Sequence, residues 1–266
     1  MVRWLSAKQF IIVQIYSRPQ LNYQICNIFI NKIVMIENEY VAILQHDVLK
    51  IKHPLKKDTT VELKRIIATK SFNITDSNNN IVVSVKKYDI GGFVESINNL
   101  DESIPVWVDH SARVFDDAKL LENSYMRNNA LLYGSSKVIH SELANHCRVS
   151  GNSIVKDSHI LDLSEVKDNA IITNSILKNN CKVYKNANIS NSTLLVAATA
   201  HGDCQINNSK IKDICEIRGT AIVSGCTYSG RVIRESGEFN NEVVERDLKL
   251  TYHEEVDEDF HKHYNV

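Results

Sequence analysis

Two pairs of acid–base side chains in this sequence are separated by the same interval. His140 stands 17 residues before Asp157, and Glu142 stands 17 residues before His159. An imidazole held beside a carboxylate is oriented by it and becomes a stronger base, as a general base must be when it takes a proton from an attacking nucleophile. These four residues are our candidate catalytic group, although an ordinary polar surface would show the same residue types.

The elements that would position these side chains follow from a hexapeptide repeat. Aliphatic residues recur every six positions from Val108 to Val138, and a small residue stands two positions before nearly every one of them. After Val138 the steps become 5, 6 and 6, which gives a period of 17 that continues to Tyr228. After Val106, the small position is Ala, Ser or Cys in all 21 cases. Such regularity indicates one repeating structural unit.

The repeat predicts an all-β fold, because a period of six excludes a long helix. Three hexapeptides make one triangular coil of short parallel strands, with the aliphatic residue inside and the small residue at a corner where two sheets converge. We predict a parallel β-helix of about seven coils, with 17–18 residues each, in a rod on the order of 30 Å long. Residues 17 apart are then neighbours, so Asp157 lies over His140 and His159 over Glu142, with Ser141 and Ser158 turned inward.

Composition excludes several other classes of protein. The 266 residues carry a net charge of −1, which argues against a nucleic-acid partner, and neither apolar N-terminal patch reaches the roughly 18 residues that span a membrane. Five of the six cysteines occupy the small column, where a thiol serves as a small hydrophobe, and no CxxC motif indicates zinc. Asn, Asp or Gly at the short corner tolerates a left-handed turn, which explains why so few glycines are present.

The pattern resembles the left-handed β-helix of the hexapeptide-repeat acyltransferases. Upstream, Asp89-Ile90-Gly91-Gly92-Phe93-Val94-Glu95-Ser96, then Asn98-Asn99-Leu100 and Val106-Trp107-Val108, is similar to the segment before the repeats in the YdcK-type group of enterobacterial acyltransferases. Arg65-Ile66-Ile67-Ala68 is similar to the N-terminal segment of that group. Members of that group are classed as acyltransferases chiefly on their repeats, so the resemblance speaks more for fold than for reaction.

What this resemblance implies is an enzyme that moves an acyl group from coenzyme A to a hydroxyl or amine, with a His as general base, in a homotrimer. The sequence itself shows no binding motif for coenzyme A. The other histidines of the repeat, His110, His146 and His201, have no carboxylate 17 residues away. A zinc site of three histidines shared between subunits, as in the hexapeptide carbonic anhydrases, is a less favoured alternative, because His140 and His146 fall on successive corners of one coil.

We expect four regions along the chain. Residues 1–60 form an extension that is weakly ordered or partly non-native, with Met35 as an alternative translation start. Residues 61–105 form a β cap with strands from Glu62 to Thr75 and from Ile81 to Val85. Residues 106–235 form the β-helix, and residues 236–266 form a C-terminal cap and an acidic tail. We expect a cytoplasmic protein.

Two further readings remain open in the sequence. The tail holds His253, His261 and His263 beside acidic residues and could bind a metal, but a solvated tail fits the same composition. The uninterrupted repeat suits a non-catalytic scaffold or protein-interaction module as well as it suits an enzyme.

Overall fold

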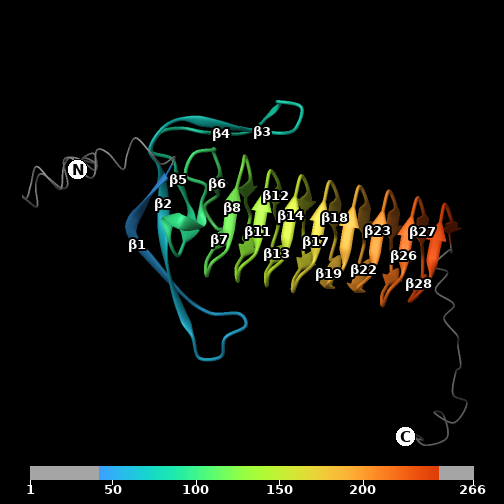
Figure 1. Cartoon of the computed structure of the whole chain (residues 1–266). Coiled ribbons are helices and arrows are strands. Elements are labelled where there is room, and N and C mark those ends of the chain that lie inside the picture. The colour runs from blue at the N-terminus through green and yellow to red at the C-terminus, as the bar shows by residue number, and fades with distance from the viewer. Residues whose placement is uncertain (1–41, 246–266) are drawn as a thin grey trace, which may run out of the picture.

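A computed structural model describes residues 42–245, which form a parallel β-helix preceded by a β cap (Figure 1). Three sheets run along the rod, and each coil contributes one short strand to each of them. The sheets hold eight or nine parallel strands, so the rod has about nine coils where the sequence predicted about seven. The predicted fold class, an all-β hexapeptide-repeat β-helix, is confirmed.

The first sheet also contains the two outer strands of the cap. Its order is β1 (Ala42–Lys52), β2 (Thr60–Ala68), β5 (Ile90–Val94), β7 (Arg113–Val114), β10 (Leu131–Leu132), β13 (Arg148–Val149), β16 (Glu165–Val166), β19 (Lys182–Lys185), β22 (Thr199–Gly202), β25 (Glu216–Ile217) and β28 (Ile233–Arg234).

The other two long sheets contain only strands of the rod. The second consists of β8 (Lys119–Leu121), β11 (Lys137–Ile139), β14 (Ile154–Lys156), β17 (Ile171–Thr173), β20 (Asn188–Ser190), β23 (Gln205–Asn207), β26 (Ile222–Ser224) and β29 (Glu238–Asn240). The third consists of β6 (Trp107–Val108), β9 (Tyr125–Met126), β12 (Glu142–Leu143), β15 (His159–Ile160), β18 (Ile176–Lys178), β21 (Thr193–Leu195), β24 (Lys210–Lys212), β27 (Thr227–Ser229) and β30 (Val243–Glu245).

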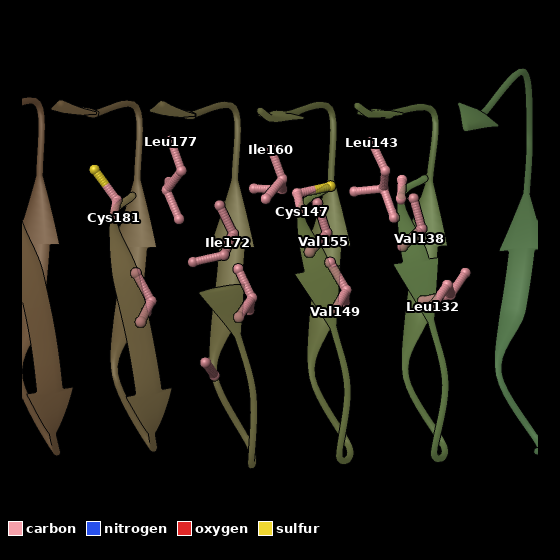
Figure 2. Packing of buried hydrophobic residues seen from close by; sticks show 14 of the residues in the cluster. Leu132, Val138, Leu143, Cys147, Val149, Val155, Ile160, Ile172, Leu177 and Cys181 are labelled. Atoms are coloured by element: carbon pink, nitrogen blue, oxygen red, sulfur yellow. The ribbon is translucent and has the colours of Figure 1, made fainter. Parts of the chain in front are cut away.

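The aliphatic column fills the rod. Each of its residues from Val108 to Tyr228 is at most 1% exposed, and successive coils pair in parallel at the predicted interval, as Val138 does with Val155 and Val155 with Ile172. Figure 2 shows these side chains stacked coil upon coil, with Cys147 and Cys181 among them. Burial of one aliphatic side chain stabilises the fold by about 1.5–3 kcal/mol. The stability of the rod is therefore the sum of many contributions of similar size.

A column of buried serines closes the tight corner between the second and third sheets. The hydroxyl of Ser175 accepts a hydrogen bond from the backbone N–H of Ser192, at 3.0 Å, and donates to the carbonyl of Thr173, at 2.7 Å. The same pattern repeats in five successive coils along this corner. Its members are Ser141, Ser158, Ser175, Ser192 and Ser209, followed by Cys226. The corner therefore needs a small residue for space, and a hydroxyl there satisfies two buried backbone groups.

The residue before each of these serines adopts the left-handed conformation that the sequence predicted. Its φ lies between 46° and 48° at His140, Asp157, Asn174, Asn191 and Asn208. On the outer corners, amide side chains continue the stacking, as in the chain of hydrogen bonds from Asn152 through Asn169 and Asn186 to Asp203. At the tight corner Asn174 and Asn191 combine both properties, because they adopt the left-handed conformation and their side chains bond to each other one coil apart.

The cap joins the rod through a pair of glycines. Strand β5 pairs antiparallel with β2 and parallel with β7, so it converts the cap sheet into the first sheet of the rod. A Cβ on Gly91 would lie 2.7 Å from the carbonyl oxygen of Val108, and one on Gly92 would come still closer to that of Asp109. Only glycine allows this approach of β5 to the first coil, which gives the Gly-Gly-Phe segment a physical reason.

The cap is larger than the sequence predicted. Residues 42–52, assigned above to the extension, form β1 and pair with β2. The expected strand from Glu62 to Thr75 is divided in two, because β2 ends at Ala68 and the chain turns before β3 (Phe72–Thr75). Strand β3 pairs with β4 (Ile81–Val85) across the expected turn at residues 76–80, and Figure 1 shows this hairpin extending along the rod. A short 3-10 helix, Ile97–Asn99, follows β5.

The rod also continues beyond the expected boundary at residue 235. Strands β29 and β30 pair with β26 and β27 and extend the second and third sheets. The buried Tyr228 occupies the aliphatic column here, and its hydroxyl donates to Glu242, which also binds Arg234. The sequence pattern ends at Tyr228 because the last coil departs from it: Phe239 and Val244 pair with Val223 and Tyr228 at an interval of 16, and Arg234 stands opposite Ile217.

The serine column yields a stability prediction. Ser175→Ala leaves the buried backbone N–H of Ser192 without its acceptor, which should cost about 1–3 kcal/mol. Urea unfolding followed by circular dichroism should show a lower midpoint. The matched control is Ser135→Ala, at an exposed position, which should stay within about 0.5 kcal/mol of the parent. Equal midpoints for the two variants would contradict this account of the corner.

Candidate functional site

The most enclosed charge on the third sheet is the carboxylate of Glu142, at the start of β12. Its side chain is 8% exposed. One oxygen, Oε1, accepts hydrogen bonds from Nε and Nη2 of Arg127, at 2.9 and 2.6 Å, and the other, Oε2, lies 3.0 Å from Nδ1 of His159. Burial would raise the pKa of Glu142, but His159 and Arg127 outweigh burial and lower the pKa below 4.5. Glu142 is therefore a fixed anion.

This anion determines how His159 is protonated. A carboxylate can only accept a hydrogen bond, so Nδ1 of His159 carries a hydrogen, and in the neutral imidazole the lone pair is on Nε2. The His159 side chain is 51% exposed, and within residues 42–245 its Nε2 has no hydrogen-bond partner. An imidazole with one nitrogen on a buried carboxylate and the other open to solvent is suited to take a proton from a bound molecule.

A second imidazole–carboxylate pair lies at the adjacent corner. Nδ1 of His140 is 2.8 Å from Oδ1 of Asp157, one coil away. The β3–β4 turn is close by: hydrogen bonds from Asn80 are the main cause that lowers the pKa of Asp76, and the charge of His140 adds to the effect. Both pairs predicted from the 17-residue interval therefore form.

Sequence reasoning missed two neighbours of Glu142. Tyr125 lies directly opposite Glu142 in the sheet, and burial together with the Glu142 carboxylate raises the pKa of its hydroxyl. The same interval of 17 would have found Tyr125. The interval of 17 could not identify Arg127, because Arg127 contacts Glu142 diagonally and stands 15 residues before it.

The histidine His201 also has a carboxylate partner that the column arithmetic missed. Nε2 of His201 lies 3.0 Å from Oε1 of Glu216, a diagonal contact over 15 residues. Its ring stacks on Tyr184 with centroids 4.7 Å apart and is 18% exposed, less open than His159. The other two histidines of the repeat, which were not candidates, have no carboxylate partner: His110 contacts Arg65, and His146 contacts Asn129.

A further histidine, His53, lies in the cap, outside the hexapeptide repeat. Its Nδ1 accepts hydrogen bonds from the backbone N–H groups of Leu55 and Lys56, and its Nε2 contacts Asp116 at 2.9 Å. Both nitrogens are engaged, so His53 holds the β1–β2 loop against the rod and has no lone pair left for a substrate.

The five cysteines of the rod are free and buried, as predicted. Burial raises the pKa of the Cys181 and Cys204 thiols to about 11. These thiols are therefore packing groups rather than nucleophiles. Cys26 and the tail histidines lie outside the described residues.

Within residues 42–245, no group of His, Cys, Asp and Glu has the geometry of a metal site. The same described part contains no helix of the length and apolarity needed to cross a membrane.

The comparison with protein families matches the middle of the rod. The family model described as GlmU-like, C-terminal hexapeptide, matches residues 111–195, which include both imidazole–carboxylate pairs. The rod is a hexapeptide-repeat β-helix. Such domains are typical of acyltransferases and related enzymes. No curated protein matches the chain.

The environment of Glu142 predicts a dependence of stability on pH. Because the folded pKa of Glu142 is below its usual 4.5, its ion pairs stabilise the fold above that pH and are lost as pH falls through the folded value. Glu142→Gln should cost about 1–3 kcal/mol at pH 7, and the difference from the parent should shrink below pH 4.5 in urea unfolding.

The control for this measurement is Glu238→Gln, which removes an exposed carboxylate with no ion pair in the described part of the chain. Its free energy of unfolding should equal that of the parent at every pH. A Glu142→Gln deficit that stays constant from pH 7 to pH 3 would show that the carboxylate charge is not what matters.

Proposed function

We propose that this protein transfers an acyl group from acyl-coenzyme A to a nucleophilic acceptor, with His159 as general base. The observation that carries the proposal is the His159–Glu142 pair, in which a carboxylate buried under Arg127 orients an imidazole with a free nitrogen at the surface. The hexapeptide-repeat domain supports it, because that domain is typical of acyltransferases. His140 and Asp157 form a second pair beside it and are the alternative base.

The proposed step is balanced as follows. The acceptor N–H or O–H gives its proton to Nε2 of His159 while its nitrogen or oxygen bonds to the thioester carbonyl carbon. The resulting tetrahedral intermediate collapses with cleavage of the C–S bond, and the sulfur leaves with the electron pair and takes the proton from His159. Glu142 stabilises the imidazolium that exists between these two transfers, so its fixed charge would lower the barrier to the first of them.

We propose further that the working form is a homotrimer. The corner between the third and first sheets exposes Leu163, Val196 and Ile214, at 64%, 46% and 59%. Val196 has a φ of 54°, a conformation that opposes a β-branched residue, whereas Asn or Asp stands at the same position in the neighbouring coils. A strained apolar residue at an exposed corner favours a contact with another copy of the chain.

A non-catalytic scaffold is the alternative, and the same apolar corner favours it. A scaffold needs the corner and the flat sheets but not the His159 lone pair. Binding of acyl-coenzyme A, and turnover that depends on His159, therefore separate the two functions.

The central test has two parts. Binding of acetyl-coenzyme A and of free coenzyme A is measured by the shift in thermal unfolding temperature. Turnover is measured by the release of free thiol in the presence of amine and alcohol acceptors. His159→Ala should keep binding and lose turnover about 10²–10⁴-fold, because only the proton transfer is removed. His201→Ala is the matched control and should keep turnover. Loss in His201→Ala alone would move the site to the first sheet, and absence of any coenzyme A binding would favour the scaffold.

The apolar corner gives a separate prediction. Val196→Asn should relieve about 1–2 kcal/mol of backbone strain within each chain and remove the apolar contact between chains. Analytical ultracentrifugation should show a trimer for the parent and a shift toward monomer for this variant. Leu55→Asn, at a residue 70% exposed in the cap, is the control and should leave the trimer intact. A trimer unchanged by Val196→Asn would place the interface elsewhere.

A further inference from the structure

A pocket of about 310 Å³ lies between the β3–β4 hairpin and the beginning of the third sheet. Its walls come from the hairpin, from the start of β5 and from strands β6 and β9 with the residues that follow them. The lining residues that matter here are Asp89, Trp107, Asp109, Tyr125 and Arg127. Phe72 of the hairpin holds the hairpin against the third sheet, because its ring packs against Trp107 in an edge-to-face contact with ring centroids 6.1 Å apart.

Two residues of the pocket lining also contact the carboxylate of the proposed catalytic pair. Tyr125 and Arg127 line it, and both contact Glu142, whose other oxygen contacts His159. Strands β9, β12 and β15 are successive neighbours in the third sheet, so His159 lies two strand spacings, about 10 Å, beyond the pocket's edge. A molecule seated in the pocket can therefore present one end toward His159.

The charges of the lining do not cancel. Arg127 is the cation among the lining residues, and its guanidinium already makes two hydrogen bonds to Glu142, outside the pocket. Asp109 is exposed and forms no ion pair or side-chain hydrogen bond in the described part of the chain. Asp89 is also exposed, and there its carboxylate accepts one hydrogen bond, from the backbone N–H of Lys86. Two carboxylates therefore face the pocket without a cation of their own, which favours a positively charged ligand.

The rest of the lining is apolar or aromatic. Val83 and Ile90 are partly exposed, and Trp107 and Tyr125 contribute aromatic groups. The hydroxyl of Ser84 is already bound to Asn73. Aromatic rings attract cations and carboxylates bind ammonium groups, whereas phosphates would be repelled, so the anionic part of coenzyme A is not suited to this pocket.

We infer that this pocket binds the acyl acceptor and that the acceptor is an amine with an apolar or aromatic body. The role of the bound amine as acyl acceptor rests on the proposed acyl transfer. Binding of an amine in the pocket does not depend on that proposal. An ammonium ligand must lose two protons to become an amide. One passes to solvent before attack, and the other passes through His159 to the departing sulfur as the C–N bond forms and the C–S bond breaks.

The test compares 2-phenylethylamine with 2-phenylethanol, which has the same body but no charge. Chemical-shift titration of the full-length protein should show the amine binding at least about threefold more tightly than the alcohol. Asp109→Asn should reduce amine affinity about threefold, and Asp89→Asn with Asp109→Asn about tenfold, while alcohol binding stays constant. Asp117→Asn, an exposed acid of the first coils outside this pocket, is the control and should change neither.

The outcomes separate this inference from the proposed function. Equal affinities for amine and alcohol, or amine affinity unchanged in the double variant, would overturn the inference even if the protein acylates a hydroxyl compound. Amine binding that depends on Asp89 and Asp109, in a protein without acetyl-coenzyme A turnover, would uphold the pocket as an amine site and overturn the acyl-transfer function. Turnover of the amine that is lost in His159→Ala and in the double variant would support both.

Discussion

The rod depends on the close approach of two sheets at each corner, where every small position from Ala112 to Cys226 is Ala, Ser or Cys. At the tight corner between the second and third sheets, Ser175 and its counterparts add a second requirement. Each hydroxyl accepts a backbone N–H from the following coil and returns a hydrogen to its own coil. These hydrogen bonds hold each of these coils to the next with an offset of 17 residues. Core packing, strand pairing and the outer amide ladders all follow from that fixed interval.

The same constraint organises the chemistry of the surface. Outward side chains of successive coils are held about 4.8 Å apart along each sheet, so a polar residue finds its partner on a neighbouring coil. Glu142 shows the result: its two oxygens are occupied by Arg127 from the preceding coil and by His159 from the following one. A rigid scaffold of this kind can hold an imidazole and its carboxylate without a dedicated loop, and the β3–β4 hairpin supplies the enclosure that a flat sheet lacks.

The fold of the rod and the pairs of the candidate site could be predicted from the sequence, because an interval of 17 identifies which residues are neighbours on successive coils. It placed His140 with Asp157 and His159 with Glu142, and it assigned the cysteines to the interior. It failed for diagonal contacts over 15 residues, namely Arg127 with Glu142 and His201 with Glu216, since side-chain length and rotamer decide these. It also said nothing of the pocket, whose walls come from the non-repetitive hairpin. Irregular segments such as β1 and the last coil carry no periodicity from which to reason.

The cap and the rod also differ in how they can change over evolution. Gain or loss of one coil would move everything beyond it by a single spacing while every corner, serine and amide keeps an equivalent neighbour. The hairpin is anchored at the first coil and does not move with such a change. The distance from the hairpin pocket to His159 is therefore set by a whole number of coils, and a change of one coil between them would alter it by about 4.8 Å.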